Sequence, residues 1–187
     1  QENNVSISED FRADHLNRVL YKCPSCLAEG KTEGKGTTLT CHACGKQYLL
    51  DEHGFMKAVE GETEFAHIPD WYKWERECVR EEVRNGTYYF EDNDARIETL
   101  PSWTKFHKHG HGRVIQTVEG TRVEVDSYYG GEPTVLFRPA LDLDSMHIEY
   151  DYLGWGDCID ISVPKDSFWC YLSGRDQITK ISFLKTT

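Results

Sequence analysis

Residues 21–50 read YKCPSCLAEGKTEGKGTTLTCHACGKQYLL and contain two Cys-x-x-Cys pairs separated by fourteen residues. A Cys-x-x-Cys turn directs two thiolates to one point, so two such turns supply the four sulfur ligands that a tetrahedral zinc ion requires. The spacing therefore predicts a single zinc ion bound by Cys23, Cys26, Cys41 and Cys44.

Short strands are predicted around the two pairs, giving a zinc ribbon over residues 21–60. GKTEGKG (30–36) predicts a mobile loop, and TTLTC (37–41) predicts a strand entering the second knuckle. QYLL (47–50) and FMKAV (55–59) predict two more strands joined by a turn. Four cysteines leave no ligand position open, and closed zinc sites are structural rather than catalytic. Redox or disulfide chemistry is the alternative use of these thiols.

Composition sets the class of the protein. At 187 residues, with 39% hydrophobic and 28% charged residues, the chain has the balance of a folded globular protein. Its net charge of −11 disfavours nucleic acid and anionic membranes as partners, because both need a basic surface. No apolar run approaches a membrane span, and no signal peptide is recognisable. Because the first residue is Gln, we expect the chain to be a piece of a longer protein.

Three cysteines lie outside the predicted site: Cys78, Cys158 and Cys170. An odd remainder beside a thiolate metal site is typical of a reducing compartment. The sequence therefore predicts a cytoplasmic location.

Two helices are predicted. Ser6 and Glu9 form a capping-box pattern, which predicts a linker helix within residues 1–20, running from about residue 7 to 19. Residues 61–86 predict a linker followed by a Trp-rich helix, with Asp70 as its N-cap and a stop at Asn85-Gly86. Trp71, Trp74 and Cys78 recur there at helical spacing, which favours core packing over a binding face.

Residues 87–187 predict an antiparallel β domain, because alternating patterns are separated by turn residues. The predicted strands are TYYFE, DARIETL, RVIQTV, TRVEVDSYY, TVLFRP, MHIEYDYL, DCIDISV, SFWCYL and QITKISFLK. Without alternating helices they favour a barrel-like sheet of the pleckstrin-homology type, with a two-sheet sandwich as the alternative. The predicted fold class is mainly β with two helices.

Three other groups of residues raise the question of chemistry. His107, His109 and His111 would share one face of a strand as metal ligands, but the adjacent glycines favour an exposed loop with adventitious binding or none. Four carboxylates could serve in acid–base catalysis or bind calcium, and the alternative is that they are polar turn residues. They are Glu149, Asp151, Asp157 and Asp160. Either Cys158 or Cys170 could form a catalytic thiol–imidazole pair with His147, and the alternative is that both cysteines are core residues. In each case we expect the non-catalytic alternative: an exposed loop for the histidines, turn residues for the carboxylates and core packing for the cysteines. No catalytic residue is predicted.

The chain resembles the region after the catalytic domain in bacterial phospholipid/glycerol acyltransferases of the 1-acyl-glycerol-3-phosphate acyltransferase class. The resemblance lies in three stretches: FRADHLNRVLYKCPSC, GTTLTCHACGKQYLLDEHGFMKAVEGETEFAHIPDWYKWERECVREEV and NGTYYFED. The resemblance is detailed over residues 9–92 and weaker in HIEYDYLGWGDCIDIS. That family transfers an acyl chain from a thioester to a glycerol-phosphate hydroxyl and uses a His followed five positions later by Asp. None of the eight histidines has Asp at that position, so only the zinc ligands carry over.

The resemblance implies a non-catalytic C-terminal accessory region with a structural zinc site, serving regulation, docking or self-association. Its expected partner is the acyltransferase catalytic domain of the same parent chain, and the parent would work at the inner face of the membrane. The alternative is a free-standing zinc-ribbon protein that binds nucleic acid or a protein partner.

Overall fold

The computed structural model describes residues 5–101, 104–140, 146–163, 166–174 and 178–184. It divides into two compact units, residues 1–78 and 79–187, and the dividing point falls within helix α1 (Ile68–Arg84). The four-segment division expected from the sequence is finer than this one, and its boundaries stay predictions.

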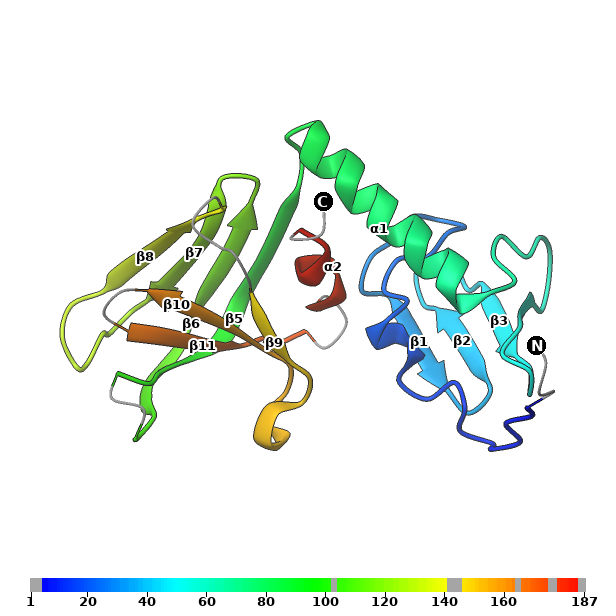
Figure 1. The fold of residues 1–187 in the computed structure, drawn as a ribbon, viewed down its shortest axis with the longest axis horizontal. Coiled ribbons are helices and arrows are strands. Elements are labelled where there is room, and N and C mark those ends of the chain that lie inside the picture. The colour runs from blue at the N-terminus through cyan, green and yellow to red at the C-terminus, as the bar shows by residue number, and fades with distance from the viewer. Residues whose placement is uncertain (1–4, 102–103, 141–145, 164–165, 175–177, 185–187) are drawn as a thin grey trace. The chain divides into compact units, whose positions relative to one another are not determined.

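The first unit is built on a four-stranded antiparallel sheet in the order β1-β2-β3-β4 (Figure 1). Its strands are β1 (Thr32–Lys35), β2 (Thr38–Cys41), β3 (Gln47–Leu50) and β4 (Met56–Ala58). Buried Leu39 and Tyr48 pair across β2 and β3 and belong to the core of this unit. The prediction of a mobile loop over 30–36 is wrong at its centre, because β1 lies there and pairs with β2.

The linker helix predicted over residues 7–19 is wrong: the structure has only a 3-10 turn at Leu16–Arg18. The backbone of this segment forms short turns with itself and also bonds to the sheet and to the turns that connect its strands. Ile7 N donates to Glu52 O at 2.8 Å, and Ala13 N donates to Gly36 O at 2.8 Å. Ser6 Oγ donates to the Glu52 carboxylate at 2.9 Å and so does not cap a helix. Tertiary hydrogen bonds here replace the local ones that the capping pattern predicts.

Gly34 in β1 is where this segment comes closest to the sheet. A Cβ at position 34 would fall on the carbonyl oxygen of Ala13 and 2.7 Å from the backbone nitrogen of Leu16. We expect Gly34→Ala to lower the free energy of unfolding by roughly 1–3 kcal/mol, because backbone atoms cannot rotate out of the way. Denaturant unfolding would measure the loss. Gly131→Ala, whose Cβ would meet only one atom within 4 Å, is the control; equal effects at both positions would contradict the prediction.

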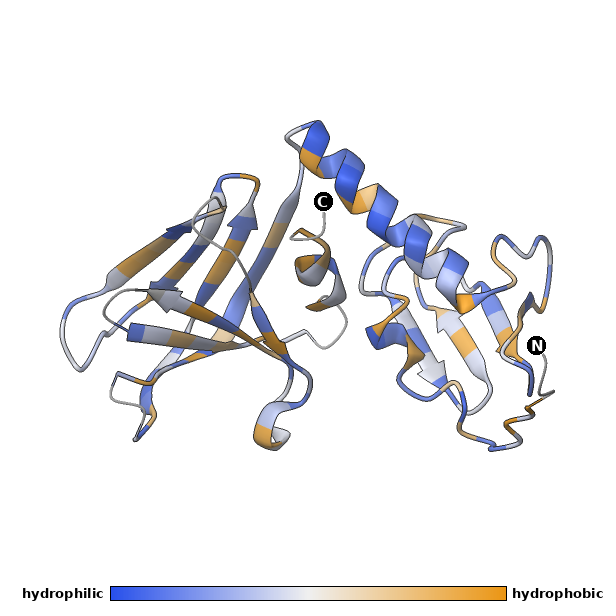
Figure 2. Ribbon diagram, in the orientation of Figure 1, coloured by the Kyte–Doolittle hydropathy of each residue, from blue (hydrophilic) through white to orange (hydrophobic). Residues whose placement is uncertain are grey.

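Helix α1 is mostly hydrophilic, with a narrow apolar side (Figure 2). Fully buried Trp71 contacts Tyr48 edge to face at 4.9 Å between ring centroids. The expected core role of this tryptophan is confirmed. The helix begins at Ile68, so Asp70 lies in its first turn and is not the N-cap. The predicted stop is confirmed by Gly86, which has a φ of 68° just beyond the last helical residue.

The second unit is a seven-stranded antiparallel sheet that curves into a half-barrel, in the order β8-β7-β6-β5-β11-β10-β9 (Figure 1). The strands are β5 (Tyr89–Thr99), β6 (His107–Thr117), β7 (Gly120–Val125), β8 (Thr134–Pro139), β9 (His147–Glu149), β10 (Cys158–Val163) and β11 (Asp166–Tyr171). A single continuous sheet fits the barrel-like prediction better than the sandwich. The predicted fold class, mainly β with two helices, is confirmed.

Three strand predictions need correction. TYYFE and DARIETL form the single strand β5, which has a register irregularity between Asp92 and Ala95. MHIEYDYL forms only the short strand β9, because Asp157 Oδ1 accepts the backbone N–H of Asp151 at 3.0 Å and turns the chain. QITKISFLK forms helix α2 (Ile178–Phe183) across its described part. Ile178 and Ile181, three residues apart, are fully buried there, as one side of a helix allows.

Candidate metal centre

Two equivalent turns carry the four cysteines. In the first turn Leu27 N donates to Cys23 O at 2.9 Å, and in the second Gly45 N donates to Cys41 O at 2.8 Å. The residue that closes each turn has left-handed backbone geometry, with φ of 62° at Leu27 and 77° at Gly45. The second knuckle thus uses a glycine for this conformation, whereas the first knuckle accepts a leucine at the same place.

The two turns bring all four Sγ atoms within 4.8 Å of one another. Cys23 Sγ lies 3.8 Å from Cys44 Sγ, and Cys26 Sγ lies 3.7 Å from Cys41 Sγ. A zinc ion with four ligands at about 2.3 Å requires sulfur–sulfur separations of about 3.8 Å. The donor set and its spacing therefore fit one zinc ion, and they leave no position for water or substrate.

Burial alternates through the cluster. Cys23 and Cys41 are 0% and 1% exposed, while Cys26 and Cys44 are exposed. Burial raises the pKa of the Cys23 thiol far above its ordinary value, although the backbone amides of Cys26 and Ser25 oppose the shift. A buried thiol of this kind ionises when a cation replaces its proton. Cys23 is thus suited to a bound metal and unsuited to free thiolate chemistry.

Helix α1 holds the backbone next to the first knuckle. Trp71 Nε1 donates to Lys22 O at 3.0 Å, and Lys22 N donates to Glu75 Oε1 at 2.8 Å. Trp71 and Glu75 are both fully buried and lie one helical turn apart. Sequence reasoning missed Glu75. The available signal was its position four residues after Trp71, within the apolar side of the helix.

The ribbon offers little positive charge to a nucleic acid. Lys22 Nζ lies 3.1 Å from the Glu29 carboxylate, and Lys46 Nζ lies 3.4 Å from that of Glu64. Both ammonium groups thus have a carboxylate partner. The exposed lysines of the ribbon are Lys31, Lys35 and Lys57.

The three histidines lie in strand β6, so the predicted exposed loop is wrong. His109 is buried, with Nε2 2.8 Å from Thr99 Oγ1, and burial lowers its pKa. His111 is exposed and its Nδ1 lies 2.8 Å from the Asp94 carboxylate. His109 and His111 therefore bond to different side chains. In the part of the chain that the structure describes, the four cysteines are the only group of three or more metal-ligating side chains.

The thiol–imidazole pair is contradicted. Cys158 and Cys170 are 1% and 0% exposed, and burial raises the pKa of both thiols. His147 is paired across the sheet with Asp160, and its ring contacts Glu149 at 2.8 Å. These cysteines are core residues, as the core-packing alternative predicted.

No family model, curated protein or solved structure matches the chain. The resemblance to acyltransferase accessory regions therefore depends on the quoted residues alone. None of the helices formed by the described residues has the length and hydrophobicity needed to cross a bilayer.

Proposed function

We propose that the chain is a non-catalytic accessory region of a phospholipid/glycerol acyltransferase, stabilised by one structural zinc ion. The observation that carries the proposal is the closed cluster of four sulfurs, whose spacing suits a metal without an open position. The sequence likeness over residues 9–92 supports the family, and the lack of a His-x4-Asp pair supports the non-catalytic role.

The work of such a region is to bind protein, and the β unit has a suitable surface. Strand β8 is at the edge of the sheet, and its Val135 and Phe137 are 55% and 50% exposed on the same side. An edge strand presents backbone donors and acceptors that a partner strand can pair with. Docking on the catalytic domain of the parent, or self-association, would use this edge.

Two measurements test the proposal. The zinc-loaded chain, given an acyl thioester and a lysophosphatidate acceptor, is expected to transfer no acyl group, and measurable transfer would contradict the non-catalytic role. Mixed with a 1-acyl-glycerol-3-phosphate acyltransferase catalytic domain, it is expected to bind saturably in sedimentation velocity. Phe137→Lys should weaken that binding about tenfold or more, since it places a charge at the edge. Val59→Lys, an exposed apolar position in the first unit, is the matched control; no binding by any form would overturn the proposal.

The alternative, a free-standing zinc ribbon acting on nucleic acid, has less support. The ribbon's Lys22 and Lys46 are paired with carboxylates, and the whole chain has a net charge of −11. Binding to nucleic acid that weakens with added salt would favour this alternative.

A further inference from the structure

A pocket of about 430 Å³ opens on the β unit, beside strands β5, β6 and β11. Its floor is a row of side chains from three neighbouring strands, because Arg96 is paired with His111 on one side and with Tyr171 on the other. The turn after β9 contributes Trp155, which follows Gly154 in the chain. In volume the pocket falls within the range of small-molecule sites.

Arg96 is held between two aromatic rings. Its Cζ atom lies 4.0 Å from the ring centroid of Trp155 and 4.3 Å from that of Tyr171. Tyr171 is buried, whereas Trp155 is 57% exposed and forms the outer wall. Contact with two rings at these distances restrains the guanidinium, which limits the directions of its N–H groups before any ligand arrives.

One donor of this restrained group is unused. Arg96 Nη2 lies 3.5 Å from the buried Glu98 carboxylate, which accounts for one edge of the guanidinium. Arg96 Nε is buried, and no described residue accepts a hydrogen bond from it. A buried charged donor without an acceptor is costly, and native proteins normally supply one. Nε itself is closed to solvent, whereas the Arg96 side chain as a whole is 20% exposed, so a ligand oxygen would reach this incompletely satisfied guanidinium through its accessible part.

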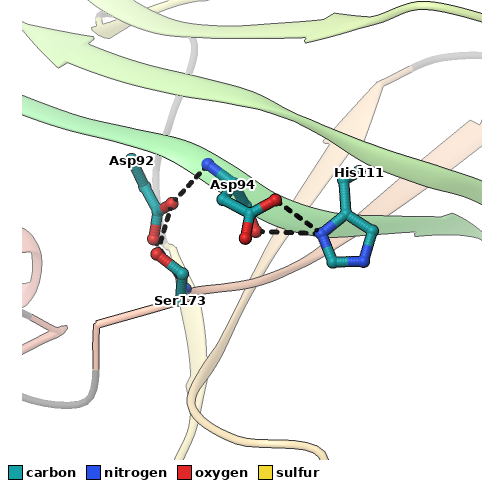
Figure 3. Close-up of polar contacts among 4 residues, drawn as sticks. All are labelled: Asp92, Asp94, His111 and Ser173. Atoms are coloured by element: carbon teal, nitrogen blue, oxygen red, sulfur yellow. Dashed lines mark hydrogen bonds and ion pairs between the residues drawn. The ribbon is translucent and has the colours of Figure 1, made fainter.

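Besides Glu98, the carboxylates of Asp92 and Asp94 are engaged with other partners (Figure 3). Asp92 accepts from Ser173 N at 2.7 Å, Ser173 Oγ at 2.8 Å and Asp94 N at 2.9 Å. Asp94 holds His111 Nδ1 at 2.8 Å. That bond occupies Nδ1, and no described residue bonds His111 Nε2, which leaves a second polar atom at the pocket.

We propose that this pocket binds an oxyanion, a carboxylate or a phosphate, attached to a flat or apolar group. Arg96 binds the oxyanion, and the exposed ring of Trp155 covers the attached group. A bare anion is a poorer ligand, because Glu98 offsets part of the Arg96 charge. Lys108, with Nζ 5.8 Å from the Trp155 ring centroid, adds a second cation near the outer wall. The inference does not depend on the proposed accessory function.

The sequence contained a weak signal for this site. Gly154-Trp155-Gly156 places a large aromatic residue between two turn-forming glycines, where it is exposed. The partners Arg96 and His111 become neighbours only through strand pairing.

The test is a titration of the zinc-loaded full chain with phenyl phosphate, benzoate and inorganic phosphate, followed by ¹H–¹⁵N correlation NMR. We expect saturable shifts of the Trp155 indole, Arg96 and Ser173 with one of the two aromatic probes, and weaker binding of inorganic phosphate. The tighter aromatic probe identifies the oxyanion as phosphate ester or carboxylate. Trp155→Ala and Arg96→Lys should each weaken binding about fivefold or more, since the first removes the ring that covers the attached group and the second removes the planar guanidinium donors.

Arg122→Lys, at an exposed arginine of β7 that binds Glu124, is the matched control and should not alter binding. Arg96→Lys risks unfolding because Glu98 is buried, but Trp155 is exposed and its removal should leave the thermal midpoint unchanged. The proposal is overturned if no probe gives saturable shifts up to about 10 mM. It is equally overturned if Trp155→Ala leaves affinity unchanged, or if inorganic phosphate binds as tightly as phenyl phosphate.

Discussion

Removal of zinc is expected to unfold residues 21–60 while residues 87–187 stay folded. The four cysteines bring two separate turns together, so metal binding supplies on the order of 10 kcal/mol of apparent stability to this small unit. The β unit has a buried core of its own that includes Ile97, Ile159, Ile161 and Phe168. It therefore does not need the metal.

The measurement is amide NMR before and after addition of a strong chelator. Resonances of β1 to β4 should collapse toward random-coil positions, and those of β5 to β11 should persist. Near-UV circular dichroism should also fall, since fully buried Trp71 would lose its fixed surroundings. Cys41→Ser should reproduce the collapse without chelator, whereas Cys78→Ser, outside the cluster, should not. Unchanged spectra after complete zinc removal would mean that the cluster is not the structural centre of this unit.

The zinc cluster could be predicted from the sequence because its geometry is local. Two ligands three residues apart on one turn hardly depend on the rest of the chain, so Cys23 with Cys26 and Cys41 with Cys44 are identifiable from spacing alone. The antiparallel character of the β unit was predictable for a similar reason, since alternation and turn residues are local patterns.

The elements that were predicted wrongly are those decided by distant contacts. Residues 7–19 carry helix-capping residues, but Gly34 lets this segment bond to the sheet, and those bonds outweigh the local pattern. Residues 178–183 fit either a strand or a helix, because short apolar segments are ambiguous in period.

Apart from Trp155, the residues of the pocket were beyond sequence reasoning. Arg96, His111 and Tyr171 are far apart in the chain and become neighbours through the register of β6, β5 and β11. The role of Glu75 could not be predicted either, because its carboxyl group accepts the backbone N–H of Lys22, more than fifty residues earlier in the chain. In both cases a polar side chain acquires its role from a strand or a helix that the sequence does not place beside it.

Glu75 is expected to make the stability of the first unit fall as pH rises. Burial raises its pKa from 4.5 to about 9, an effect only partly opposed by the backbone N–H and the charge of Lys22. The native carboxyl therefore keeps a proton across the neutral range, whereas the unfolded carboxyl loses it above its ordinary pKa. Because the native state binds more protons than the unfolded state, its stability is full below pH 4.5 and declines until pH reaches about 9. The limiting slope is about 1.4 kcal/mol per pH unit.

The decisive experiment compares the zinc-loaded protein with Glu75→Gln by denaturant unfolding between about pH 6.5 and 9, a window in which thiolate–zinc bonds persist. Glutamine keeps an oxygen to accept the N–H of Lys22 but has no proton to lose. Proton release from the cysteines affects both proteins alike, so the difference between the two curves isolates Glu75. We expect Glu75→Gln to gain on the wild type steadily as pH rises, and Glu77→Gln, at an exposed position of the same helix, to follow the wild type. Parallel curves for all three proteins would show that Glu75 is already ionised in the native state, and that the carboxylate holds Lys22 through charge rather than through a neutral hydrogen bond.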